Sequence, residues 1–135
     1  EAIRDSDRKV LLLASGALSH TFHKLRDLRK HEASDPKHIY SKEAYEYDMQ
    51  VLEWMKAGDH KAILDDFDNF RKFKPEAGFF HYLAMAGAVG EESWQSKGEL
   101  YSEYENSIGT GQVHVWFPAQ PGGFPKPKDV VLSRD

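Results

Sequence analysis

The stretch VLLLASGALSH, Val10–His20, is a short apolar run that ends in small residues and delivers a histidine. Lys9–Ser15 is apolar without alternation, which predicts a strand buried on both faces. A strand that ends in a turn of small residues holds a side chain at the rim of a sheet, where α/β proteins place their chemistry. His20 is therefore the first candidate for a catalytic residue, although its position alone leaves a structural role equally open.

The composition limits the classes of protein that the chain can be. Its 135 residues, 40% of them apolar, predict one compact domain. The net charge of -4 comes without a basic face, which argues against nucleic-acid binding. No apolar run approaches the roughly 18 residues that cross a bilayer, so we expect no membrane contact. The absence of cysteine excludes disulfides and thiolate metal sites and fits a cytoplasmic protein.

The two ends of the chain suggest how it is organised. Glu1–Asp5 is typical of the last turns of an amphipathic helix, so the sequence is expected to begin in the middle of a βα unit. This favours the C-terminal part of a larger enzyme over a trimmed or processed start. We expect residues 1–118 to form the catalytic part and residues 119–135 to form a proline-rich extended tail, which is suited to lie on a neighbouring subunit of a homo-oligomer.

The middle of the chain carries signals for two consecutive helices. Ser41 is a good N-cap for the first helix, and Gly58 is suited to end it. Asp59 offers an N-cap for the second helix. The acidic residues on the outer face of the second helix are expected to be a solvated surface rather than a cation site; they are Asp65, Asp66 and Asp68.

A third helix is predicted to begin at Pro75, because proline suits the first helical position. It is apolar almost all round, which indicates burial, so Glu76 in its first turn would point into the interior or onto a cavity. The simpler alternative is that Glu76 complements the helix dipole. His81 would lie roughly 140° around the helix from Glu76, on a different face.

The C-terminal part predicts strands at Leu100–Tyr104 and Gln112–Phe117. Between them, the two glycines around a threonine in Ser107–Gly111 allow the backbone to approach a ligand closely. As a phosphate-binding loop this segment is a weak match, because no lysine or helix start follows it.

The seven histidines show no self-contained metal motif, because neither H-x-H nor H-E-x-x-H spacing occurs. His114 alternates within a predicted strand. Four others lie among polar residues and are expected to be exposed; they are His23, His31, His38 and His60.

Three motifs together resemble the C-terminal half of the class III extradiol ring-cleavage dioxygenases. They are Leu13–His20 (LASGALSH), Lys74–Gly78 (KPEAG) and Ser107–Val113 (SIGTGQV), in the order and at about the spacing of that family. The family includes homoprotocatechuate 2,3-dioxygenase and the β subunits of protocatechuate 4,5-dioxygenase and 2-aminophenol 1,6-dioxygenase. The resemblance implies an α/β fold with a central, largely buried sheet flanked by helices.

The resemblance also implies a site. In the family, two histidines and one glutamate hold Fe(II) and leave positions for a catecholate and O₂. Glu76 matches the glutamate, and His20 matches the acid/base histidine that takes a proton from the substrate hydroxyl. The segment Gly109, Thr110 and Gly111 matches a loop beside the substrate. No segment here resembles the two iron-binding histidines, so we expect them from an N-terminal half or a partner chain.

These observations predict Fe(II)-dependent extradiol cleavage of a catechol-type ring by O₂. The Gly109–Val113 segment and the following Phe117-Pro118 resemble the homoprotocatechuate enzymes more than the protocatechuate ones. This resemblance implies 3,4-dihydroxyphenylacetate as the first substrate, with 2-aminophenol or a protocatechuate-like catechol next. Two alternatives stay open at this point. One is a non-catalytic interaction or regulatory protein on the same fold, and the other is a different metal-dependent enzyme that uses His20 and Glu76.

Overall fold

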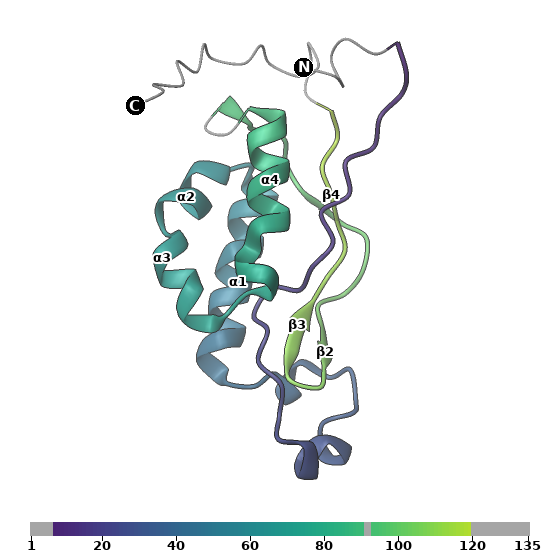
Figure 1. Ribbon diagram of the computed structural model, residues 1–135, viewed down its shortest axis with the longest axis vertical. Coiled ribbons are helices and arrows are strands. Elements are labelled where there is room, and N and C mark those ends of the chain that lie inside the picture. Colours follow the sequence, from purple (N-terminus) through teal and green to yellow (C-terminus); the bar gives the residue numbers. More distant parts are fainter. Residues whose placement is uncertain (1–6, 91–92, 120–135) are drawn as a thin grey trace, which may run out of the picture.

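The computed structural model describes residues 7–90 and 93–119, so the predicted helix at Glu1–Asp5 and nearly all of the predicted tail lie outside the described residues. The α-helices gather on one side of the molecule, and the extended N-terminal segment and the strands lie on the other (Figure 1). The α-helices are α1 (Lys42–Ala57), α2 (His60–Asp65), α3 (Phe67–Phe70) and α4 (Phe80–Val89). Short 3-10 helices cover Leu25–Lys30, Pro36–His38, Arg71–Phe73 and Glu76–Phe79.

The predicted caps of the first two helices are confirmed. Ser41 Oγ accepts a hydrogen bond from the N–H of Ala44 at 3.1 Å, which satisfies an unpaired donor in the first turn of α1. Gly58 ends α1 with φ 76°, a left-handed conformation that glycine adopts at little cost. Asp59 caps α2 by accepting from the N–H of Ala62 at 3.1 Å.

The strands form two antiparallel pairs. β1 (Glu99–Leu100) pairs with β4 (Val115–Trp116), and β2 (Glu105–Ser107) pairs with β3 (Thr110–Gln112). The β2–β3 hairpin turns through two residues, Ile108 and Gly109, with φ of 56° and 109°. Positive φ at both central residues is what a tight turn between twisted strands requires.

A central buried sheet is not found among the described residues, which corrects the expected architecture. Residues 9–15 are extended but belong to no strand pair. Leu11 and Leu13 are 68% and 84% exposed, so this segment is not buried on both faces as predicted. A strand needs a neighbour to pair its backbone groups, and no strand in the described part of the chain pairs with residues 9–15. The fold is therefore a mixed one, with helices and a few short strands.

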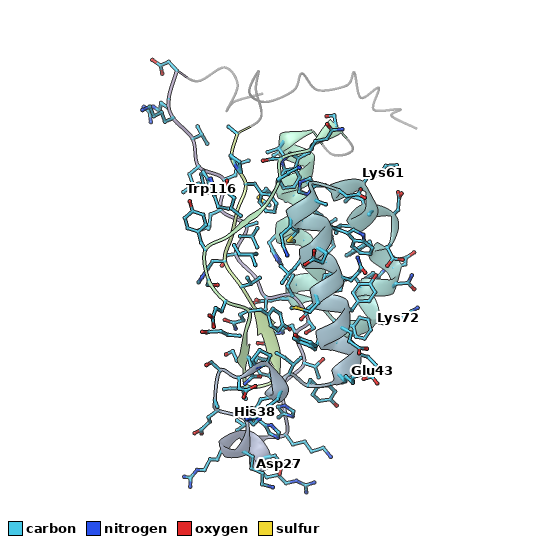
Figure 2. All side chains as sticks on the ribbon, turned by 180° about the vertical axis from the view of Figure 1, so that it is seen from behind. Asp27, His38, Glu43, Lys61, Lys72 and Trp116 are labelled. Carbon is cyan, nitrogen blue, oxygen red and sulfur yellow. The ribbon has the colours of Figure 1, made fainter. Side chains whose placement is uncertain are left out.

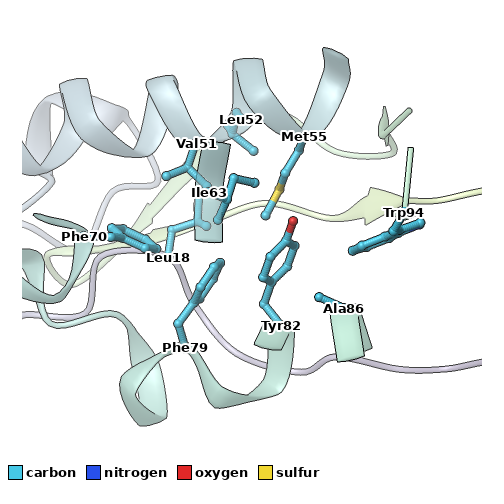
Figure 3. Close-up of a cluster of buried hydrophobic side chains, with 10 residues drawn as sticks. All are labelled: Leu18, Val51, Leu52, Met55, Ile63, Phe70, Phe79, Tyr82, Ala86 and Trp94. Carbon is cyan, nitrogen blue, oxygen red and sulfur yellow. The ribbon is translucent and has the colours of Figure 1, made fainter. Parts of the chain in front are cut away.

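One apolar core joins the helices to the extended segments (Figure 3). Leu18 lies in this core beside residues of α1, α2 and α4, and thereby anchors the chain just before His20. Burial of such a side chain contributes about 1.5–3 kcal/mol. The buried members of the core are Leu18, Val51, Leu52, Met55, Ile63, Phe70, Phe79, Tyr82, Ala86 and Trp94.

His60 is fully buried, which corrects the prediction that it is exposed. Its Nε2 lies 2.7 Å from the carbonyl oxygen of Ser96, and its Nδ1 lies 2.6 Å from the hydroxyl of Tyr82. Because a carbonyl only accepts, Nε2 carries the proton and Nδ1 accepts from Tyr82. The ring also stacks on Trp94 at 3.6 Å. Polar surroundings in the sequence could not reveal these partners, which come from distant segments.

No helix in the described ranges has the length and apolar character needed to span a bilayer.

Candidate functional site

His20 lies at the end of the anchored segment, directly after the buried residues Leu18 and Ser19. Its backbone N–H donates to the carbonyl oxygen of Phe73 at 3.3 Å. Its half-buried imidazole meets the edge of the Phe22 ring, with 4.8 Å between the ring centroids. The hydrogen bond therefore fixes the backbone position of His20, while part of the imidazole ring stays exposed to solvent.

Glu76 is tied to the same segment. Its Oε2 accepts a hydrogen bond from the N–H of Ala17 at 2.7 Å. Together with the bond from His20 to Phe73, this contact joins Ala17–His20 to Phe73–Glu76 at both ends. The structure thus brings the segments that carry His20 and Glu76 side by side, although they are more than fifty residues apart in sequence.

The chain after Glu76 is not the predicted continuous helix. Ala77, Gly78 and Phe79 have φ of 48°, 63° and 63°, and α4 begins only at Phe80. Glu76 therefore lies outside the first turn of α4 and does not complement its dipole there. Left-handed conformations cost Ala77 and Phe79 about 1–2 kcal/mol each. Backbone strain of this kind clusters at functional sites.

The break also changes the position of His81. Burial lowers the pKa of His81 below its ordinary value, and the interaction of its ring with the Glu76 carboxylate opposes this shift only in part. The ring lies directly over Gly16, where a Cβ would stand 2.4 Å from Cε1 of the imidazole. Among the buried side-chain nitrogen and oxygen atoms of the described residues, Nδ1 of His81 is the one for which no hydrogen-bond partner is found. The helical geometry predicted from the sequence missed this proximity.

Gly109, Thr110 and Gly111 pack against the segment that leads to His20. Gly111 exchanges two backbone hydrogen bonds with it, from Leu18 N–H at 2.9 Å and to the carbonyl of Ser19 at 3.0 Å. A Cβ on Gly109 would stand 2.5 Å from the carbonyl oxygen of Thr21. The close approach expected of these glycines is thus made to the protein's own backbone, on both sides of His20.

Asp48 completes the arrangement from α1. It is fully buried, and its Oδ1 accepts from the Ser19 N–H at 2.9 Å. Its Oδ2 accepts from the hydroxyls of Ser19 and Tyr104, both at 2.6 Å. Burial raises the pKa of Asp48 to about 6, against the opposing effect of these donors. The carboxylate therefore remains mostly ionised at neutral pH.

Two cavities flank this region. The first, of about 390 Å³, is mostly apolar and is lined by residues 10–14, Gly16, His81 and the strand end at Val115–Phe117, among others. The second, of about 400 Å³, is lined by Ser19 and Thr21 on either side of His20, by Phe73, and by charged residues. Glu43 and Lys72, which both line the second cavity, lie near the same end of α1 (Figure 2). Neither His20 nor Glu76 is among the lining residues of either cavity.

The model of a protein family described as the catalytic LigB subunit of aromatic ring-opening dioxygenase matches residues 1–118. The chain belongs to this family. LigB membership confirms the resemblance seen in the three motifs and implies ring-opening dioxygenase chemistry. A comparison with curated proteins finds no match.

The LigB family implies iron, and the described residues do not form a complete site for it. Within residues 7–90 and 93–119, no group of three or more His, Cys, Asp or Glu is placed to hold a metal ion. Glu76 could supply one ligand, since a hydrogen bond such as the one from Ala17 N–H orients a carboxylate for metal binding. A lone carboxylate is a weak site for Fe(II), so further ligands are required.

Sequence reasoning missed Asp48. The signal was present, because Asp48 occupies the same face of α1 as Ala44, Val51 and Met55, which are all buried. An acid on the apolar face of a helix requires hydrogen-bond partners. Those partners, Ser19 and Tyr104, lie on other segments, and only the fold identifies them.

Proposed function

We propose that this chain carries the acid/base residue and one iron ligand of an Fe(II)-dependent extradiol dioxygenase that opens a catechol-type ring with O₂. His20 is the acid/base residue, Glu76 is the ligand, and Gly109–Gly111 lies beside the substrate. The observation that carries this proposal is the pair of hydrogen bonds that joins Ala17–His20 to Phe73–Glu76. Family membership supplies the reaction class.

His20 would accept a proton from the substrate hydroxyl. An imidazole suits this task because it exchanges protons near neutral pH. The half-buried ring can reach a ligand, while its backbone is held by Phe73 and by the buried Ser19 next to it. A fixed base reduces the entropic cost of reaching the reactive geometry.

The charged lining of the second cavity favours a substrate whose aromatic ring carries an acidic substituent. Two cationic side chains, Lys72 and Lys74, and one acidic side chain, Glu43, line it together with the residues on either side of His20, so that its charged lining is positive on balance. A carboxylate on the substrate would be attracted to this end of the site. We therefore propose 3,4-dihydroxyphenylacetate as the first substrate to test, with 2-aminophenol and protocatechuate next.

The remaining iron ligands would come from histidines on another segment or a partner chain. This part of the proposal rests on the ligand set of the family, two histidines and one glutamate, of which Glu76 matches the glutamate. The alternative of a different metal enzyme is tested by metal analysis, which distinguishes iron from zinc in the intact protein.

The test is ring cleavage by the intact protein. It is loaded with Fe(II) without oxygen and then mixed with aerated buffer and each of the three substrates. We expect oxygen uptake together with a yellow ring-fission product. His20→Gln is expected to lower kcat by about 10²–10⁴-fold, the usual contribution of a general acid/base.

His114→Gln is the matched control, because His114 is an exposed histidine on the chain between β3 and β4. It should retain the wild-type rate. If no substrate gives a ring-fission product, the enzyme assignment is wrong and a non-catalytic role is favoured. If His20→Gln cleaves as fast as His114→Gln, the acid/base assignment is wrong even though the protein is a dioxygenase.

A further inference from the structure

Asp48 is an acid in a place where an apolar residue would be the simplest choice. It lies on the buried face of α1 with no exposed surface, one helical turn before the buried residues Val51 and Leu52. Removing a carboxylate from water costs several kcal/mol, and its contacts must offset that cost. The partners of such a buried charge therefore show which segments it holds in place.

The hydrogen bonds to Asp48 come from two segments, one of which carries His20. Ser19, the residue before His20, donates both its N–H and its hydroxyl. Tyr104 donates its hydroxyl from the chain that leads into β2. Gly111 lies against both the Asp48 carboxylate and the Tyr104 hydroxyl. A Cβ at this position would stand 2.2 Å from Asp48 Oδ2 and 2.1 Å from Tyr104 Oη.

The backbone of the same residues is paired directly. Leu18 and Ser19 exchange hydrogen bonds with Gly111, as described above, so the chain before His20 and the Gly109–Gly111 loop form one unit. Asp48 is hydrogen-bonded to this unit through Ser19. It is also hydrogen-bonded to Tyr104, whose hydroxyl lies against Gly111. A shift of the carboxylate would therefore move the acid/base residue and the loop together.

We propose that Asp48 is a positioning residue, which uses Ser19 and Tyr104 to hold His20 and the Gly109–Gly111 loop in register for reaction. This inference rests on the proposed function and adds to it a residue that does not touch the substrate. Asp48 is linked to His20 only through Ser19, so its effect falls on geometry. Displacements of about 1 Å in such an arrangement cost on the order of 10²-fold in rate.

The experiment compares Asp48→Asn and Tyr104→Phe with wild type in two measurements. Asn keeps the shape and the acceptor for the Ser19 N–H but removes the charge. The first measurement is the ¹³Cε1–¹Hε1 NMR signal of His20, assigned through its loss in His20→Gln. The second is steady-state ring cleavage by the intact, iron-loaded protein.

We expect the His20 signal to move or broaden in Asp48→Asn, and kcat to fall by at least about tenfold while KM changes by less than about threefold. Tyr104→Phe removes one donor and should act in the same direction with a smaller effect. Its packing is otherwise unchanged, so it tests the proposal if Asp48→Asn does not fold.

The matched control is Asp66→Asn, because Asp66 also accepts a hydrogen bond from a tyrosine, Tyr47, but lies between α2 and α3. It should leave the His20 signal and kcat unchanged. Unchanged His20 signals in folded Asp48→Asn or Tyr104→Phe would overturn the positioning role, as would an unchanged kcat. If wild type itself cleaves no ring, the proposed function fails and the NMR comparison alone decides whether Asp48 positions His20.

Discussion

The buried carboxylate of Asp48 should make the stability of the protein depend on pH in a particular direction. Burial raises its pKa from 3.8 to about 6 in the folded state. A group with a raised pKa contributes stability that is fully present below its unfolded pKa and is lost as the pH rises through its folded pKa. A shift of about 2 units corresponds to about 3 kcal/mol, which is almost entirely lost at pH 7. Lowering the pH to 5 should recover about 1 kcal/mol of it.

The assay is urea unfolding of wild type and Asp48→Asn at pH 7 and pH 5. Burial also lowers the pKa of His60 and His81, and the folded state therefore loses stability through them as the pH falls below about 6.5. Those losses are common to both proteins and cancel in the difference. The free energy of unfolding of wild type minus that of Asp48→Asn should therefore rise by about 1 kcal/mol from pH 7 to pH 5.

A difference that stays constant, or that falls as the pH is lowered, would refute this reasoning. It would mean that Asp48 is not a desolvated carboxylate held by neutral donors. Asp66→Asn again serves as the control, because hydrogen bonds from Tyr47 and Asn69 lower the pKa of Asp66. Because this pKa lies below the ordinary value of 3.8, the free energy of unfolding of wild type minus that of Asp66→Asn should stay constant from pH 7 to pH 5 and should fall only in more acidic buffer.

Three further outcomes follow from the packing and the charges. Gly111→Ala should destabilise the protein by about 1–3 kcal/mol in urea unfolding, since its Cβ would overlap Tyr104; a neutral effect would contradict the close approach. His60→Ala should cost about 3–5 kcal/mol, because it opens a cavity and leaves Tyr82 without its acceptor; a thermal shift of only a degree or two would count against this. Lys74→Gln should raise KM about tenfold for 3,4-dihydroxyphenylacetate but not for unsubstituted catechol; equal KM changes would remove the lysine from substrate binding.

The local signals in the sequence predicted local structure well. Ser41, Gly58 and Asp59 cap their helices as expected, because a cap depends on residues within one turn. The strand predicted at Lys9–Ser15 depends on a partner strand, and none of the strands in the described residues pairs with it. Apolar character alone could not indicate whether such a partner is present.

The sequence did not predict how the segments of the candidate site are connected, and the roles of its residues stay predictions. The sequence motifs drew attention to His20 and Glu76, and the fold joins their segments. The start of α4 was misplaced, because Ala77 and Phe79 adopt left-handed conformations that their residue types do not favour. Such conformations are imposed by tertiary contacts, which here include the bond between Glu76 and Ala17.

The most direct test of the account is iron content and oxygen uptake in intact wild type and Glu76→Gln, with Glu53→Gln as control, because Glu53 is an exposed acid on α1. We predict that wild type and Glu53→Gln hold Fe(II) and consume one O₂ for each ring opened. Glu76→Gln should bind iron far more weakly and form no ring-fission product. Iron content and ring cleavage at the wild-type level in Glu76→Gln would contradict the central claim that this glutamate belongs to a ring-opening iron site.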